Sequence, residues 1–186
     1  MADEETDQVR ARLEKYVGQP MAPPSVAPDP VNVPMIRHWV DALDDRNPVY
    51  LDEEIATNSR FGGIVAPPAM LQVWSMSRPK IEGIAARGGA PVEMDFDNPI
   101  GALDEAGYVG ILATNSELEF VRYLRPGDLL HLTTAVESIS NLKTTSLGKG
   151  YFVTWVTTYT SGGDEVVGRQ LFRVFKFDPS TIGAPA

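Results

Sequence analysis

The sequence offers few side chains that could transfer a proton near neutral pH. It contains no cysteine and two histidines, His38 and His131, neither of which has the neighbouring ligands that a metal site requires. We expect His38 to be solvated or hydrogen-bonded on a helix and His131 to lie within a strand. The carboxylate with the most suggestive position is Asp45, which precedes a turn imposed by Pro48. Asp45 either takes part in proton transfer or only caps the preceding helix.

Two adjacent glycines, Gly62 and Gly63, offer a different kind of chemistry. They precede an apolar segment that opens with Pro67 and Pro68, a pair suited to the first turn of a helix. Backbone N–H groups at the start of a buried helix could stabilise an oxyanion, and the helix dipole would add to that effect. The alternative is that both are turn glycines, and we favour the binding role.

Composition excludes several classes of protein. The 186 residues include 16 basic and 25 acidic side chains, a formal net charge of −9, and such an acidic chain is a poor ligand for nucleic acid. Without cysteine there can be no disulfide, zinc–thiolate site or cysteine nucleophile. Residues 1–16 lack the apolar stretch of a signal peptide, and no apolar run approaches the roughly 18 residues of a membrane span. We expect a cytoplasmic protein that binds neither membrane nor nucleic acid.

The N-terminal part of the chain has the pattern of helices joined by an extended arm. A helix is predicted from Thr6 to about Tyr16, followed by a proline-rich extended arm, so that residues 1–30 form a helix and an arm. Asn32 is placed to cap a helix with one apolar face, and a short helix is predicted from Asp52 to about Asn58.

The middle of the chain contains an apolar segment and a long insertion. Residues 66–76 are apolar on nearly every side, which predicts a buried helix. Residues 78–108 are rich in glycine and proline, and insertions of that length are often functional. We expect the insertion to cover or extend a binding pocket.

The C-terminal part has the two-residue alternation of β-strands. Turn sequences RPGD, SNLK and SGGD separate the strands and are suited to hairpins. Helices followed by an antiparallel meander indicate an α+β protein, and one buried helix with such a sheet fits a hot-dog fold, in which the sheet wraps the helix. The predicted strands are 111–123, 129–139, 144–160 and 165–177.

Several motifs, in order and at the expected spacing, resemble the MaoC-like enoyl-CoA hydratase/dehydratase family of hot-dog proteins. The resemblance covers roughly residues 30–177, and four narrower motifs look like the MaoC subunit of actinobacterial steroid side-chain hydratases. The family motifs are DRNPVY (45–50), DEEIA (52–56), FGGIVAPP (61–68) and YLRPGD (123–128); the narrower ones are IRHW (36–39), NPVY (47–50), GGIVAPPAMLQ (62–72) and GRQLFR (168–173).

The resemblance implies a site that is incomplete in this chain. In the family, an Asp and a His from the pattern D-x-N-P-x-H act on one water molecule as it adds to a trans-2-enoyl thioester. Asp45, Asn47 and Pro48 match, but Tyr50 occupies the histidine position, and a phenol with a pKa near 10 is a poor proton carrier at neutral pH. The chain therefore resembles the N-terminal, non-catalytic type of hot-dog half, in which Asp45 and Tyr50 are remnants of the dyad.

The resulting hypothesis is a single MaoC-like hot-dog domain over residues 1–186 that binds substrate for a heteromeric enoyl-CoA hydratase. The substrate would be a bulky steroid side-chain trans-2-enoyl-CoA, with no metal and no cofactor besides the CoA thioester, and a small hot-dog partner would carry the Asp/His dyad. Related subunits continue into a domain that docks a thiolase, which we expect to be absent here. The expected substrate-binding residues are Asn47, Tyr50, Gly62, Gly63, Val65, Ala66 and Met70.

Two other functions remain open from the sequence. An acyl-CoA thioesterase could work with one carboxylate and would need no histidine. A non-enzymatic module that binds acyl-CoA or a partner protein would bind without turnover.

Overall fold

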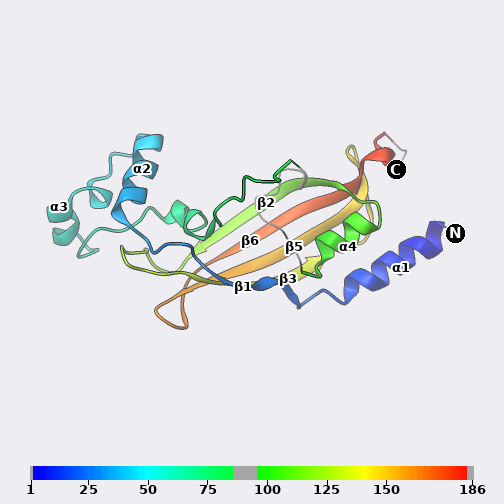
Figure 1. Cartoon of the computed structure of the whole chain (residues 1–186), viewed down its shortest axis with the longest axis horizontal. Helices are drawn as coiled ribbons and strands as arrows, with labels where there is room; N and C mark the ends of the chain where they lie inside the picture. Colours follow the sequence, from blue (N-terminus) through cyan, green and yellow to red (C-terminus); the bar gives the residue numbers. More distant parts are fainter. Residues whose placement is uncertain (1, 86–95, 184–186) are drawn as a thin grey trace.

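One antiparallel sheet organises the computed structural model, which describes residues 2–85 and 96–183. The strand order is β1-β3-β5-β6-β2, and the short strand β4 pairs with β5 (Figure 1). The strands are β1 (Pro20–Val26), β2 (Gly110–Phe120), β3 (His131–Ile139), β4 (Lys143–Thr145), β5 (Gly148–Ser161) and β6 (Glu165–Asp178). The predicted antiparallel α+β class is therefore confirmed.

The connectivity differs from the predicted meander in two places. The segment RPGD does not close a hairpin, because β2 pairs with β6 while β3 pairs with β5. Residues 121–130 therefore connect β2, at one edge of the sheet, to β3, which lies next to the opposite edge strand. The predicted strand 144–160 is divided, because the chain turns back before Gly148 and β4 pairs with the first residues of β5. Gly148 has a φ of +116°, which disfavours any residue with a side chain.

The proline-rich arm forms β1 at an edge of the sheet. Its register against β3 shifts between Pro20 and Ala22 and again between Ala22 and Ser25. Proline has no N–H to donate to a ladder, and an edge strand with irregular pairing accommodates it. The extended conformation predicted for the arm is confirmed.

Local capping explains where most helices begin. The Asn32 side chain accepts a hydrogen bond from the Met35 amide (3.0 Å) at the start of α2 (Val33–Leu43), as predicted. Asp52 does the same for the Ile55 amide (2.9 Å) at α3 (Glu53–Asn58). The first helix, α1 (Ala2–Glu14), begins before the predicted Thr6.

The predicted buried helix over residues 66–76 is wrong in form. The segment instead makes two 3₁₀ turns, η2 (Pro68–Met70) and η3 (Val73–Ser75). In such turns residues three apart lie on one side, and Leu71 and Trp74 are both buried while Gln72 is exposed. Tight packing holds this geometry, because a Cβ on Gly168 of β6 would lie 2.6 Å from a Leu71 methyl carbon.

A different helix covers part of the sheet. Helix α4 (Pro99–Glu105) lies within the predicted insertion and buries Ala102 and Leu103 against β3, β5 and β6 (Figure 1). Asp104 of α4 forms an ion pair with Lys176, which is only 2% exposed. Because residues 86–95 of the insertion lie outside the described residues, its expected role over a pocket stays a prediction.

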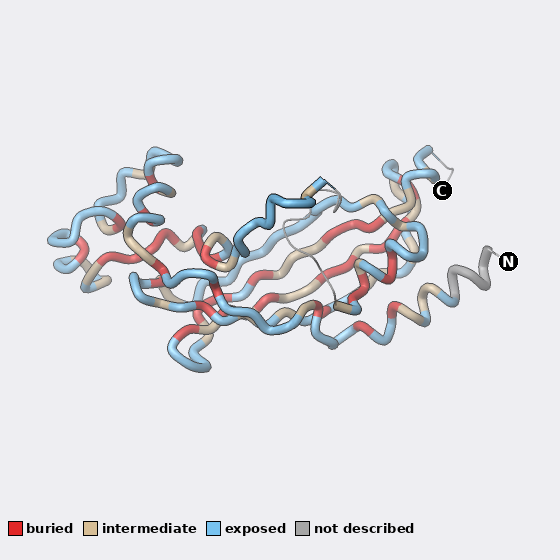
Figure 2. Tube along the Cα trace, in the orientation of Figure 1, coloured by how far each residue is buried: buried red, intermediate tan, exposed pale blue. Residues whose placement is uncertain are grey.

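Burial is uneven across the sheet. Figure 2 shows buried positions along β5 and β6, whereas β2 is exposed along nearly its whole length. We call the face that carries Tyr151, Val153, Trp155, Thr157 and Tyr159 the inner face, since α4 and the 3₁₀ turns pack on it. No helix among the described residues is long and apolar enough to cross a membrane.

Candidate functional site

The turn that contains Asp45 is a self-contained capping structure. The Asp45 carboxylate accepts a hydrogen bond from the Asn47 amide (3.0 Å), and the Asn47 side chain accepts one from the Val49 amide (3.3 Å). The Asp45 amide in turn donates to Val40 O (2.9 Å) at the end of α2. These bonds explain the turn without a catalytic role for Asp45, although its half-buried carboxylate keeps further acceptor capacity.

Tyr50 is buried beside this turn. Burial raises the pKa of Tyr50, and the neighbouring Tyr123 and Asp45 raise it further, against a hydrogen bond with Asn47 that lowers it. The phenol is therefore protonated at neutral pH and cannot accept a proton from water. The structure thus brings Asp45, Asn47 and Tyr50 together. A buried and protonated Tyr50 is suited to packing or to lining a binding site, and not to proton transfer.

Gly62 and Gly63 do not form the expected oxyanion site. The Gly62 amide donates to Ser59 O (3.2 Å) and the Gly63 amide to Ala56 O (3.1 Å), so both donors close the end of α3. Their φ angles of +67° and +152° belong to a turn that favours glycine. Residues 66–76, which follow the glycines, do not form the continuous helix whose dipole was expected to help stabilise an oxyanion.

The other expected binding residues lie in the core. Val65, Ala66 and Met70 are at most 1% exposed and pack in the cluster that also contains Tyr50 and Trp74. The Ala66 amide donates to Leu124 O (2.8 Å). These residues hold the 3₁₀ segment against the sheet and do not line the largest cavity described below.

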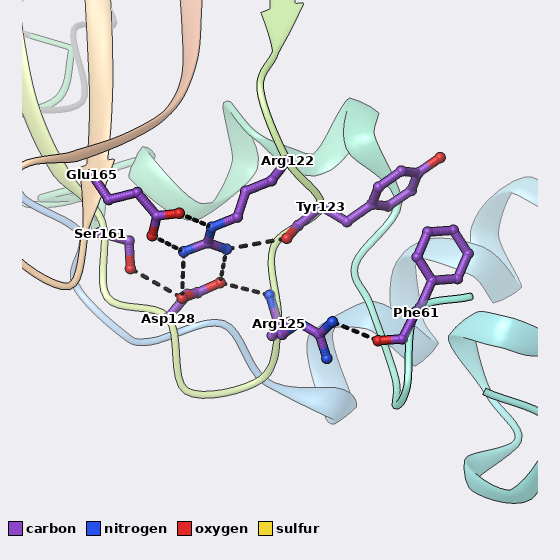
Figure 3. Close-up of polar contacts among 7 residues, drawn as sticks. All are labelled: Phe61, Arg122, Tyr123, Arg125, Asp128, Ser161 and Glu165. Carbon is purple, nitrogen blue, oxygen red and sulfur yellow. Dashed lines mark hydrogen bonds and ion pairs between the residues drawn. The ribbon is translucent and has the colours of Figure 1, made fainter. Parts of the chain in front are cut away.

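A network of charged side chains stabilises residues 121–130, which connect β2 to β3 (Figure 3). Arg122 donates to both oxygens of Asp128 (2.7 and 3.1 Å) and to both oxygens of Glu165 (2.9 and 2.8 Å). Asp128 also accepts from the Arg125 amide (2.7 Å) and from Ser161 Oγ (3.1 Å). The Arg125 guanidinium reaches Phe61 O, so the network also fixes the loop that carries the two glycines.

The network stabilises the ionised form of its acids. Burial opposes the charge on Asp128, but hydrogen bonds from Arg122 and from the Arg125 amide prevail and lower the pKa of Asp128. The Arg122 hydrogen bond likewise lowers the pKa of Glu165. The YLRPGD motif therefore has a structural role here.

Replacing Asp128 with Asn is expected to lower the free energy of unfolding by about 1–2 kcal/mol at pH 7, because Arg122 loses a partly buried charged partner. The lowered pKa of Asp128 means that its stabilisation is complete above about pH 4 and is lost as the pH falls through the folded-state value. Urea denaturation as a function of pH measures both effects. Glu119→Gln, in the exposed pair with Arg169, is the control and should cost less than about 0.5 kcal/mol. Equal losses for the two variants would contradict the prediction.

A cavity of about 460 Å³ lies on the inner face, between the part of the sheet covered by α4 and the part covered by the 3₁₀ turns. Trp155 and Phe172, whose ring centroids are 5.3 Å apart, contribute aromatic surface. Thr157 and Gln170 contribute polar groups, and Met76 lies on the opposite side, on the segment after η3. A mainly apolar cavity with a few polar groups is the usual form of a small-molecule site.

A second cavity of about 310 Å³ adjoins the first. The two share Met76, Ser77 and Pro79, and the second also reaches Trp74 and Arg78. Arg78 is paired with the carboxylate of Asp29 (3.0 Å), so its charge is partly neutralised. The segment after η3 therefore lines both cavities, the first toward the sheet and the second toward the start of α2.

Sequence reasoning missed the residues of the main cavity. The alternation in β5 and β6 predicted which side chains share a face, and Gln170 belongs to the GRQLFR motif. No local pattern predicts a cavity here, because its lining residues come from the 3₁₀ segment and from three strands, which meet only in the folded chain.

Comparison with known proteins places the chain in a family. Residues 15–170 match the family described as FAS1-like, dehydratase domain region. A protein of Thermomonospora curvata named "Probable enoyl-CoA hydratase alpha subunit" is 44% identical over 169 residues, 90% of this chain and 51% of the relative. The Mycobacterium tuberculosis 3-oxo-4,17-pregnadiene-20-carboxyl-CoA hydratase alpha subunit is 41% identical over 88% of this chain and 49% of its own length. The chain belongs to the FAS1-like dehydratase family of MaoC type and spans about half the length of these curated relatives.

Solved structures support the same family and the hot-dog fold. The crystal structure of the ChsH1–ChsH2 complex from Mycobacterium tuberculosis contains a chain that is 36% identical, with a TM-score of 0.74 over 98% of this chain and 93% of that one. The MaoC-like dehydratase from Rhodospirillum rubrum has a TM-score of 0.56 at 23% identity, over 85% of this chain and 92% of that one. The second likeness concerns the fold alone.

Proposed function

We propose that this chain is the substrate-binding, non-catalytic subunit of a heteromeric enoyl-CoA hydratase. Its relatives are named as alpha subunits of such hydratases, and one similar structure is a complex of two proteins. The chain has a protonated phenol, Tyr50, where the family's proton carrier is an imidazole. Asp45 and Asn47 are occupied in capping a turn. The Asp/His dyad would therefore come from a small hot-dog partner.

The cavity on the inner face supports a bulky acyl group as the ligand, and it is the observation that carries the proposal. Among the described residues, a cavity of about 460 Å³ lies between the 3₁₀ segment and the rings of Trp155 and Phe172, and a second cavity of about 310 Å³ shares part of its lining. Flat aromatic and aliphatic walls suit a ring system such as a steroid, and the CoA thioester is the only cofactor-like group required.

The exposed edge of the sheet supports a partner subunit. Strand β2 has 11 residues and pairs only through β6 within the described residues, which leaves its other edge open. Long, apolar edge strands are templates for pairing with another chain. We propose that the partner pairs here. The large exposed apolar residues of β2 are Ile111, Leu112, Leu118 and Phe120.

Introducing charge at this edge is expected to release the partner. The double substitution Leu118→Lys and Phe120→Lys should abolish co-purification of the hot-dog partner, because two ammonium groups would be desolvated at the interface. Both side chains are exposed, 37% and 44%, so the thermal stability of the isolated chain should change little. Pull-down followed by mass identification measures the loss. Val26→Lys at the opposite edge is the control, and loss of the partner in that variant alone would contradict the placement.

A further inference from the structure

A row of polar side chains crosses the inner face beneath the cavity. Thr134 of β3 is the register partner of Thr157 of β5, which is the register partner of Gln170 of β6. Thr157 and Gln170 are only 8% and 5% exposed. Before this row along β5, Trp155 pairs with the apolar Phe172 of β6. After it, Tyr159 pairs with the apolar Leu132 of β3. Polar groups are costly in such a place unless they are bonded, so a row of them calls for a reason.

Hydrogen bonds fix the orientation of the Gln170 amide. The Tyr159 hydroxyl donates to Gln170 Oε1 (3.0 Å), which directs the amide nitrogen away from Tyr159. That nitrogen donates to Ser116 Oγ on β2 (3.0 Å) and to Gln72 Oε1 on the 3₁₀ segment (3.3 Å). The Gln170 amide N–H therefore points toward the wall of the cavity that Gln72 forms.

The bond to Gln72 is the replaceable one. It is the longest of the three, and Gln72 lines the cavity, whereas Ser116, which is also exposed, does not. An oxygen acceptor on a ligand in the cavity could take the place of Gln72 Oε1, and Gln72 would then bond to water. The exchange keeps the buried Gln170 donor satisfied, so it costs little.

We propose that Gln170 is a specificity-determining residue that selects bulky acyl groups carrying a carbonyl or hydroxyl oxygen over fully apolar ones. The inference rests on the proposed function, since it concerns the same cavity. An oxygenated acyl group that displaces Gln72 Oε1 keeps the Gln170 amide hydrogen-bonded. An apolar acyl group of the same shape displaces Gln72 without offering an acceptor, so it leaves the buried amide N–H unpaired. Sites that hydrogen-bond a ligand oxygen discriminate against ligands that lack it.

The test uses two saturated polycyclic carboxyl-CoA thioesters that differ at one ring carbon, C=O in one and CH2 in the other. Saturated thioesters cannot be hydrated, so isothermal titration calorimetry on the full chain measures binding alone. The chain is expected to bind the ketone about tenfold more tightly. Gln170→Met, close to glutamine in volume, should reduce that ratio to less than about twofold, because it removes the donor that distinguishes the two compounds.

Two further variants keep the test decisive. Gln72→Met leaves the buried row intact and removes the acceptor that either ligand must displace, so both thioesters should bind severalfold more tightly and the preference for the ketone should remain; this result can be obtained even if Gln170→Met folds poorly. Thr158→Val, on the outer face of β5, should leave the ratio unchanged. Equal binding of the two thioesters to the unmodified chain, or a preference that survives Gln170→Met, would overturn the inference alone. Failure of both thioesters to bind would instead contradict the proposed function.

Discussion

The purified chain alone is expected to hydrate a trans-2-enoyl-CoA at a rate close to that without protein, and the addition of a dyad-bearing hot-dog partner should raise the rate by at least about a hundredfold. General acid–base catalysis contributes roughly 10²–10⁴-fold, and the buried, protonated Tyr50 cannot supply it. The loss of absorbance of the conjugated thioester measures the rate for the chain, the partner and the mixture.

Asp45→Asn separates this function from its rivals. In a complex whose partner carries the dyad, the substitution should change turnover by less than about threefold, because Asn can still accept the hydrogen bond from the Asn47 amide. A thioesterase that uses Asp45 would lose its release of free CoA thiol, and a pure binding module would show no turnover with any partner. Robust hydration by the single chain, abolished by Asp45→Asn, would show that the chain is a self-sufficient hydratase.

Filling the cavity is expected to abolish binding of bulky acyl groups selectively. Thr134→Phe adds a ring to the cavity wall in a strand that favours aromatic residues. Excluding four or five ligand carbons forfeits about 3–4 kcal/mol at roughly 0.8 kcal/mol per carbon, or a hundredfold or more in affinity for a steroid carboxyl-CoA. Butyryl-CoA should lose less than about threefold.

A control separates filling of the cavity from a loss of folding. Val109→Phe adds the same group at an exposed position, 59% exposed, that does not line the cavity, and it should affect neither ligand. Calorimetric titration with the two thioesters provides the comparison, and circular dichroism reports folding. A parallel loss for both ligands in Thr134→Phe would argue against the cavity as the acyl site.

Features that depend on a few neighbouring residues were predictable from the sequence. Asn32 and Asp52 each bond to an amide three residues ahead, so the helix starts follow from the local sequence. The alternation in residues 165–177 determined which side chains of β6 share a face, because successive side chains of a strand point to opposite sides. The replacement of the family's histidine by Tyr50, and hence the absence of an imidazole there, also follows from the sequence alone.

Features that depend on residues far apart in the chain were decided by the tertiary structure. RPGD has the chemistry of a hairpin, but β2 finds its partner in β6, and Arg122 bonds to both Asp128 and Glu165 across the crossing. Gly62 and Gly63 were expected to bind an oxyanion, yet their N–H groups donate hydrogen bonds to the carbonyl oxygens of Ser59 and Ala56.

The cavity itself depends on a competition that no local pattern reveals. Residues 66–76 are apolar enough for a buried helix, but a helix of that length is marginal by itself, and packing of Leu71 against Gly168 favours the 3₁₀ turns. The sequence by itself determined most of the strands, the starts of α2 and α3, and the missing proton carrier. The tertiary structure alone decided that the described residues enclose a cavity above Gln170 on the inner face, because burial and hydrogen bonding are settled only when distant segments compete for the same surface.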